Sequence, residues 1–407
     1  MMKNKPKKLT PKLRFPEFKD EWRPATIGDL FRSEDEYEKA SAFESDKILT
    51  VKLHANGVVR NERTGTLMGG ANYFKRRAGQ FIFSKIDLLN GAFGIVPEEL
   101  DGFYSSSDIP AFSFGTPHSP KFFLHWLVAH YRRLEIERTG TSATLRRVSP
   151  EKFRAVSIPL PSPAEQRKIT ACLMSLDEWI AAERRKLEVL RTHKKGLMQQ
   201  LFPREGETRP RLRFPEFRNA PAWKVTVGGK LFTNRNEDGE EGLPIYSVTV
   251  NEGMVPRASF DRDFYDIEDP AGNKKVYKGD IAYNMMRMWQ GAQGVAVEDC
   301  MVSPAYVVLA PLREVCSEFF AYLFKLPQSL HVLTSHSRGL TLDRLRLYFD
   351  DFKRVPFRVP EFSEQQRIAT CLSSLDALIA VQSRKLDGLR AHKKGLMQQL
   401  FPSSEGV

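Results

Sequence analysis

Two stretches of the chain, residues 163–203 and 362–402, carry apolar side chains at alternating steps of four and three residues. Both are rich in Leu, Ala, Lys, Gln and Arg, which favour helix, and prolines stand only at or near their ends. The pattern predicts two long helices of about 37 residues, each roughly 55 Å long at 1.5 Å per residue.

The apolar positions of these helices repeat every 3.5 residues on average, which is the period of a two-helix coiled coil. The predicted seam consists of Ile169, Leu173, Leu176, Ile180, Leu187 and Leu190 in the first helix and of Ile368, Leu372, Leu375, Ile379, Leu386 and Leu389 in the second. In the alternative, each helix packs on the core of its own domain, which favours a wider apolar stripe. We expect the two helices to pair with each other.

The rest of the chain predicts a mixed α/β fold. Short β-branched or aromatic runs at 47–51, 81–83, 245–250 and 306–309 are bounded by Gly, Asn, Asp or Pro and predict strands. Helical composition returns at 120–138 and 314–335.

The chain also repeats itself at a shift of 199 residues. Leu-Arg-Phe-Pro-Glu-Phe at 13–18 returns at 212–217, and segments 165–203 and 364–402 are identical at 26 of 39 positions. Two copies of one domain are therefore predicted. The expected segments are a basic N-terminal segment (1–21), a first domain (22–162), a central helix (163–203), a linker (204–222), a second domain (223–361), a distal helix (362–402) and a tail (403–407).

Charge indicates a polyanionic partner. The chain has 62 Lys and Arg against 50 Asp and Glu, a net charge of +12. Its four cysteines are widely spaced, which favours neither disulfides nor a zinc site and fits a reducing cytoplasm. The basic start runs into Pro11 without an apolar core, so we expect neither a secretion signal nor a membrane span.

Motifs of the common enzyme classes are missing. The sequence has no phosphate-binding loop, no HExxH zinc helix and no GxSxG elbow. It also lacks the Asp/Asn-Pro-Pro-Tyr/Phe element expected of a DNA amino-methyltransferase, and its histidines show no ligand spacing. We expect no catalytic residue and no metal site in this chain.

Candidate DNA contacts gather in predicted loops, where cations can meet phosphates and Arg, Lys, Asn, Gln, Ser or Thr can reach base edges. They are Thr50, Lys52, Asn56, Arg60, Arg63, Lys75, Arg76, Arg77, Arg138, Thr141, Ser142 and Arg146 in the first copy, and Thr249, Asn251, Lys274, Lys275, Asn284, Arg287, Gln290, Ser337, Arg338, Thr341 and Arg344 in the second. For each residue alone, a solvated surface side chain is the alternative. Because the copies share glycines and differ in these loops, the set predicts two different targets.

These features together resemble the specificity subunits of type I restriction–modification systems. The resemblance runs from Leu13 to Pro402. It rests on the repeated Leu-Arg-Phe-Pro-Glu-Phe starts, each followed by a Trp, and on the Glu-Gln pairs at 165–166 and 364–365. The Leu-Asp pairs at 176–177 and 375–376 and the Lys-Lys-Gly-Leu-Met-Gln-Gln-Leu-Phe helix ends complete it.

The resemblance implies two target-recognition domains separated by an antiparallel pair of helices, each domain reading half of a bipartite sequence in double-stranded DNA. It implies a non-catalytic subunit that recruits two DNA methyltransferase subunits, which use S-adenosylmethionine, and restriction subunits that use ATP and Mg²⁺. The repeated helix ends are candidates for docking these partners, through Lys195, Met198, Gln199, Lys394, Met397 and Gln398. Recent duplication explains their identity equally well.

Two other functions stay open at this point. One is a coiled-coil adaptor or DNA-binding regulator without methyltransferase partners. The other is an enzyme with an unrecognised site. Co-purification with a methyltransferase argues against the first, and methyl transfer by the isolated chain would indicate the second.

Overall fold

The computed structural model describes residues 10–33, 38–39, 46–62, 72–140, 146–260 and 270–402. The chain divides into two compact units, residues 1–184 with 384–407 (unit 1) and residues 185–383 (unit 2). This division does not follow the sequence repeat, because each unit takes one domain from one copy and the end of the closing helix from the other copy. The mixed α/β fold is confirmed.

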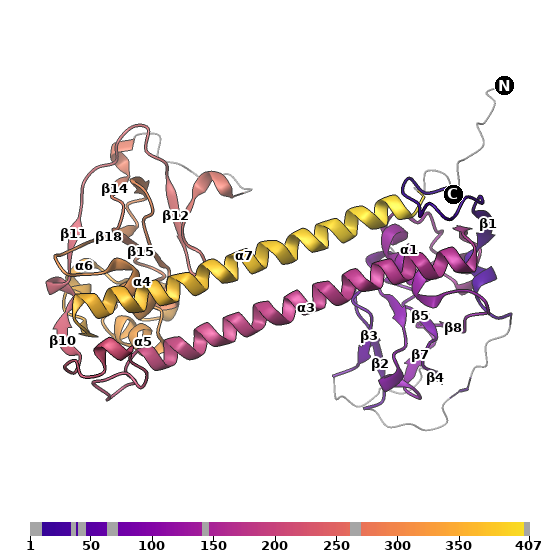
Figure 1. Cartoon of the computed structure of the whole chain (residues 1–407), viewed down its shortest axis with the longest axis horizontal. Helices are drawn as coiled ribbons and strands as arrows, with labels where there is room; N and C mark the ends of the chain where they lie inside the picture. Colours follow the sequence, from indigo (N-terminus) through magenta and orange to yellow (C-terminus); the bar gives the residue numbers. More distant parts are fainter. Residues whose placement is uncertain are drawn as a thin grey trace. The chain divides into compact units, whose positions relative to one another are not determined.

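Unit 1 is built from short strands and helices (Figure 1). Its antiparallel strands surround a three-stranded sheet of order β6-β5-β8. Its strands are β1 (Arg23–Thr26), β2 (Leu49–Val51), β3 (Val58–Arg60), β4 (Tyr73–Lys75), β5 (Phe81–Phe83), β6 (Phe93–Ile95), β7 (Tyr104–Ser106), β8 (Ala111–Phe112) and β9 (Ser157–Leu160). Its short helices are α1 (Pro120–His130) and α2 (Pro150–Arg154), and the 3-10 turns η2 (Leu88–Asn90) and η4 (Tyr131–Arg133) lie side by side. Phenylalanines of β5, α1 and α2 fill the core, where Phe81 meets Phe123 edge to face and stacks on Phe153.

Unit 2 repeats this plan around a four-stranded sheet of order β11-β18-β15-β16. Its strands are β10 (Lys224–Val227), β11 (Phe232–Arg235), β12 (Tyr246–Thr249), β13 (Gly253–Pro256), β14 (Lys274–Val276), β15 (Ile281–Asn284), β16 (Gln293–Val295), β17 (Cys300–Val302), β18 (Tyr306–Pro311) and β19 (Pro356–Val359). Its short helices are α4 (Ser317–Leu323), α5 (Pro327–Ser335) and α6 (Phe349–Phe352), and η9 (Met288–Gln290) packs against α5.

Repeated glycines shape the same turn in both units. Gly91 and Gly291 end η2 and η9 with φ of 82° and 81°, a conformation that favours glycine. Gly94 and Gly294 let a neighbouring hairpin approach, since a Cβ there would lie 3.1 Å from the Cα of Gly57 and 2.9 Å from that of Gly253. The glycines shared between the copies therefore preserve one loop arrangement.

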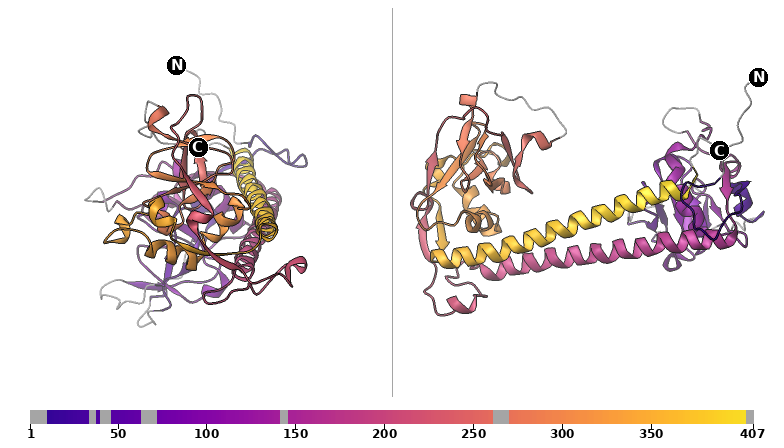
Figure 2. Two further views of the ribbon diagram at one scale, coloured as in Figure 1. Left: turned by 90° about the vertical axis from the view of Figure 1, so that its left-hand side faces the viewer. Right: turned by 45° about the horizontal axis from the view of Figure 1, so that its top comes forward.

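The two predicted long helices are present as α3 (Pro163–Leu201) and α7 (Phe362–Leu400), and Figure 2 shows both as unbroken helices. α3 begins at a proline, which is tolerated in a first turn, and prolines 203 and 402 follow the two helix ends. In each unit the first half of one helix pairs antiparallel with the second half of the other. In unit 1, Lys393 of α7 donates to Asp177 of α3 at 2.5 Å, and in unit 2, Lys194 of α3 donates to Asp376 of α7 at 2.7 Å.

The predicted seam combines the two packing modes considered above. Ile169 and Leu173 lie in the core of unit 1, and Ile368 and Leu372 lie in the core of unit 2. Towards the middle of the helices the seam packs helix on helix: Leu187 and Leu386 are buried, while Leu176, Ile180, Leu190, Leu375, Ile379 and Leu389 are half-buried. The coiled coil is thus confirmed, with its ends merged into the domain cores.

The repeated start of each copy is fixed to the base of its helix. Arg14 forms a two-pronged ion pair with the buried Glu165 at 2.8 Å, and Arg213 repeats it with Glu364 at 2.7 and 2.6 Å. The neighbouring Gln166 and Gln365 side chains accept backbone N–H groups of Ser119 and Cys316. These shared residues are therefore structural.

Candidate nucleic-acid interface

Three loops adjoin one another in each unit and occupy equivalent places. The hairpin loop joins β2 to β3 (52–57) or β12 to β13 (250–252). The central loop follows β5 (84–92) or β15 (285–292), and the closing loop spans 139–147, of which 139–140 and 146–147 are described, or 338–346. Backbone bonds of Val148 to Lys85 and of Leu347 to Met285, at 2.8 and 2.9 Å, place the closing loop beside the central loop in both units.

The hairpin loop lies beside the end of the central loop. In unit 1 the N–H groups of His54 and Ala55 donate to the carbonyls of Asn90 and Gly91, both at 2.8 Å. In unit 2, Gly253 at the start of β13 lies against Gly294, just after the central loop. The described parts of the three loops therefore adjoin one another in each unit and form its candidate interface.

The closing loop is pinched at its ends by the same backbone pairing in both units. Thr139 and Arg147 exchange two bonds at 2.9 and 2.8 Å, and Arg338 and Arg346 exchange two at 2.9 Å. Two carboxylates brace these ends, because Arg147 pairs with Asp108 at 3.1 Å and Arg338 with Asp351 at 2.7 Å. In unit 2, where the whole loop is described, a loop held at its base can present its tip in a defined way.

Eight of the predicted contact residues lie exposed on or beside these loops, with no side-chain partner among the described residues. They are Lys52, Arg138, Arg146, Asn251, Arg287, Gln290, Thr341 and Arg344. Thr50 is half-buried in β2. Sequence alone gave no signal for two apolar residues of the closing loop in unit 2, Leu340 and Leu342, which are also exposed.

Several other predicted residues form local bonds that shape the loops. Among them, Asn56 donates to Leu53 at 2.9 Å, the Asn284 amide oxygen accepts from Met286, and the Thr249 hydroxyl accepts from Glu252. Ser337 donates to the carbonyl of Leu333 at 2.9 Å. Arg60 and Arg77 are exposed and pair with Asp46 and Glu38, and the half-buried Lys75 also pairs with Glu38. These pairs are weak enough to be exchanged for phosphate.

Arg76, Lys274 and Lys275 are corrections to the predicted set. The Arg76 side chain is 2% exposed and donates to Ser105 and to the carbonyl of Ile109, so it cannot reach a ligand. Lys274 donates to the carbonyl of Tyr306 at 3.0 Å, and burial lowers its pKa. Lys275 donates to Glu240, which raises its pKa.

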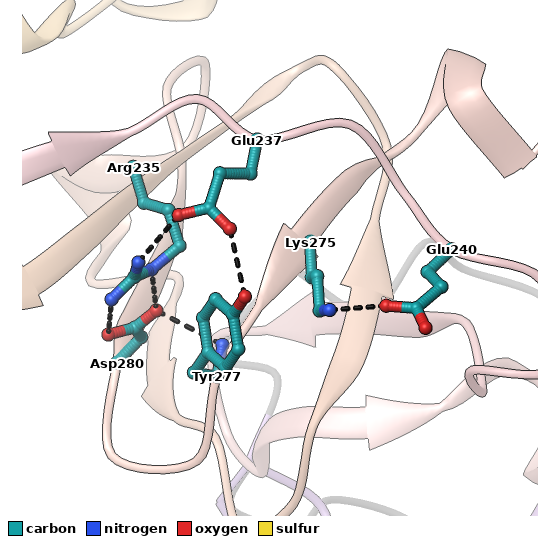
Figure 3. A network of polar contacts seen from close by, with 6 residues as sticks. All are labelled: Arg235, Glu237, Glu240, Lys275, Tyr277 and Asp280. Atoms are coloured by element: carbon teal, nitrogen blue, oxygen red, sulfur yellow. Dashed lines mark hydrogen bonds and ion pairs between the residues drawn. The ribbon is translucent and has the colours of Figure 1, made fainter.

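Lys275 belongs to a polar network that ties β11 to β14 and to the turn before β15 (Figure 3). Arg235 lies between Asp280 and Glu237, and the Tyr277 hydroxyl donates to Glu237 at 2.9 Å. Because three carboxylates face two cations here, the network does not attract a polyanion. Sequence could not show this, because the carboxylates come from distant segments.

Three predicted DNA contacts, Arg63, Thr141 and Ser142, lie outside the described residues.

Two of the six predicted docking residues pack against the domain cores. Met397 lies in the core of unit 1 and is 7% exposed, and Met198 packs against the core of unit 2. These methionines hold the helix ends to the domains, so Met397 is no part of an accessible docking face. Lys195, Gln199, Lys394 and Gln398 are exposed and stay predictions.

The described part of the chain contains no group of three or more His, Cys, Asp or Glu side chains that could hold a metal ion. None of its helices is long and apolar enough to cross a membrane.

Comparisons with known proteins agree with this geometry. The model of the type I restriction modification DNA specificity domain matches twice, at residues 19–192 and 225–391. Two Methanocaldococcus jannaschii proteins are similar to the chain. The putative type I restriction enzyme MjaX specificity subunit is 21% identical, over 69% of this chain and 67% of its own length. The type I restriction enzyme MjaVIII specificity subunit is 24% identical, over 66% of each.

A solved structure shares the fold. The S subunit of a type I restriction–modification system from M. genitalium superposes with a TM-score of 0.59 at 18% identity, over 97% of this chain and 99% of that one. Both matched segments span one recognition domain and most of one long helix. The chain therefore belongs to the type I restriction–modification DNA specificity family, whose members are non-catalytic subunits that recognise a DNA target.

Proposed function

We propose that unit 1 and unit 2 each read one half of a bipartite sequence in double-stranded DNA through their three loops. This proposal is supported by the fact that the described parts of the loops have the same arrangement in both units but carry different side chains. In the central loop, unit 1 carries Asp87 and Asn90, bonded to each other at 2.9 Å, where unit 2 carries Arg287 and Gln290, both exposed. Arg favours guanine and Gln favours adenine in the major groove, so the two units suit different bases.

The helices α3 and α7 set the spacing between the two half-sites in this proposal. Each has 39 residues, roughly 58 Å at 1.5 Å per residue, which is more than one turn of B-DNA. Uncontacted base pairs should therefore separate the two half-sites.

The chain brings no catalysis of its own in this proposal. It docks two methyltransferase subunits, which supply S-adenosylmethionine-dependent methylation of adenine, and restriction subunits, which supply ATP- and Mg²⁺-dependent translocation and cleavage. The repeated, exposed Lys195 and Lys394 suit two equivalent partners, since identical partners need equivalent faces.

Methylation mapping of the host DNA, with and without this gene, tests the function. We expect a bipartite motif whose methylation disappears when the gene is removed, and co-purification of a methyltransferase with the tagged chain. Unchanged methylation at every motif would contradict the proposal. A DNA-binding chain that captures no methyltransferase would favour a regulator.

The spacing role has its own test. Seven residues are inserted into both helices, after Arg184 and after Ser383, which keeps the seam in register because a heptad repeats it. The added rise is about 10 Å, roughly three base pairs, so the spacer should lengthen while both half-sites stay the same. An unchanged spacer would show that the helices do not set the distance between the half-sites.

A further inference from the structure

We propose that unit 1 carries a second DNA contact, which binds backbone phosphate and reads no bases. The site is a basic groove of about 550 Å³ between η4 and the last turns of α7. Its basic lining comprises Arg132, Arg133, Arg390, Lys393 and Lys394, with His54 beside them. The proposal deepens the proposed function and depends on it.

The charge of the groove favours an anion. Five Arg and Lys side chains line it, and no Asp or Glu does. Lys393 is held by Asp177 and Arg390 by Asp387, but Arg133 and Lys394 form no ion pair with any residue that the structure describes. Cations gathered in this way repel one another, and a polyanion removes that repulsion while releasing its counterions.

The groove also adjoins the reading edge of unit 1. His54 and Ala55 belong to the hairpin loop, which is bonded to the central loop, and they form one wall of the groove. Both have left-handed backbones, with φ of 59° and 57°, although neither is glycine. Such conformations cost energy and persist where the surroundings hold them, often at binding sites. A duplex lying on the loops would thus pass its backbone close to the groove.

The groove joins residues from both copies of the repeat. Arg132 and Arg133 come from the first domain, whereas Arg390, Lys393 and Lys394 come from the distal helix. The equivalent helix end in unit 2 differs, because Lys194, which pairs with Asp376 as Lys393 does with Asp177, also lies 5.0 Å above the Tyr322 ring. The phosphate contact is therefore assigned to unit 1.

Salt dependence of DNA binding tests the groove. The full chain, assembled with its methyltransferase subunits, is titrated with a random-sequence duplex and with the duplex carrying its methylated motif. The double variant Arg132→Gln/Arg133→Gln should flatten the slope of log affinity against log salt by about 1.8, or 0.9 per lost phosphate contact. The methylated motif should stay the same. Both side chains are exposed, so the fold should persist, which a thermal scan checks.

Repeat mates provide a matched control. Arg390 and Arg191 occupy equivalent helix positions, and each pairs with the acidic residue three positions earlier. Arg390→Gln should flatten the slope by about 0.9, and Arg191→Gln should leave it unchanged. Equal losses from both variants would reveal a general charge effect and overturn the assignment.

Three further outcomes would overturn the inference. They are an unchanged slope in the double variant, a change in the first half of the methylated motif, and loss of the methyltransferase subunits in the absence of DNA. The last would assign the groove to a protein partner. A wild-type complex with no sequence preference would instead contradict the proposed function.

Discussion

The closing turns of α3 and α7 have the same sequence, from His193 to Pro203 and from His392 to Pro402, yet they meet different surroundings in the two units. In unit 1, Lys393 donates to Asp177, His125 approaches the same carboxylate at 3.5 Å, and an open basic groove adjoins them. In unit 2, Asp376 accepts both Lys194 and the Tyr322 hydroxyl, the latter at 2.6 Å. One scaffold thus acquires different surfaces from the domains it joins.

The largest expected effect tests whether each helix end completes the core of the other copy's domain. Phe401 packs at 2% exposure against Phe122 of unit 1, with ring centroids 5.6 Å apart, and Phe202 packs against Phe319 of unit 2 at 5.3 Å. Phe401→Ala should destabilise unit 1 by about 3–5 kcal/mol, and Phe202→Ala should do the same to unit 2, because each leaves a cavity.

Hydrogen exchange separates these two effects. Amides of β5 should lose protection in Phe401→Ala, and amides of β15 should lose it in Phe202→Ala. The reverse pattern would show that the units follow the linear repeat instead.

A somewhat smaller effect is expected at the repeated ion pairs. Arg14→Ala should destabilise unit 1 by about 3 kcal/mol, because it leaves the Glu165 carboxylate buried without its partner. Arg213→Ala should cost unit 2 more, since the Arg213 side chain is 8% exposed against 16% for Arg14. Urea unfolding, monitored by amide hydrogen exchange in each unit, measures both losses of stability. An unaffected unit 1 would show that its start is held by other contacts.

The smallest expected effects are on the pH dependence of stability, at the acid end for unit 1 and at the alkaline end for unit 2. Burial pushes the pKa of Asp177 up, but hydrogen bonds from His125 and Lys393 outweigh burial and leave it below the usual value. A lowered folded pKa gives stability that is present above about pH 3.9 and disappears as the pH falls further. Asp177→Asn should therefore reduce the acid sensitivity of unit 1.

Unit 2 should respond at the alkaline end. Burial, followed by the bond to Asp376, raises the pKa of Tyr322 well above its usual value. A raised folded pKa gives stability that is complete below about pH 10 and is lost above it. Amide hydrogen-exchange rates in unit 2 should rise less steeply between pH 9 and 11 in Tyr322→Phe than in the parent. Equal slopes would show that the hydroxyl contributes nothing there.

Sequence predicted the parts of the fold that depend on local periodicity. The 3.5-residue spacing was sufficient for α3, α7 and their pairing, and the repeat was sufficient for two similar domains. It could not predict that Leu201 and Phe202 enter the core of unit 2, because that packing joins the end of one copy to the domain of the next.

The candidate interface was predicted less completely. Exposed loop residues such as Arg287 were found by residue type, but burial of Arg76 and pairing of Lys275 with Glu240 depend on strand neighbours that charge does not reveal. The basic groove was missed as a unit because its cations come from segments about 260 residues apart.

Independent reading by the two units is the central claim, and a domain exchange tests it most directly. Residues 22–160 are replaced by the same domain of another family member whose distal helix also ends in Leu-Met-Gln-Gln-Leu-Phe-Pro, which keeps the contact between Phe401 and its neighbours. Methylome sequencing should then show a new first half-site beside an unchanged second half-site. A motif altered in both halves, from a chain that still co-purifies with its methyltransferase, would contradict the account.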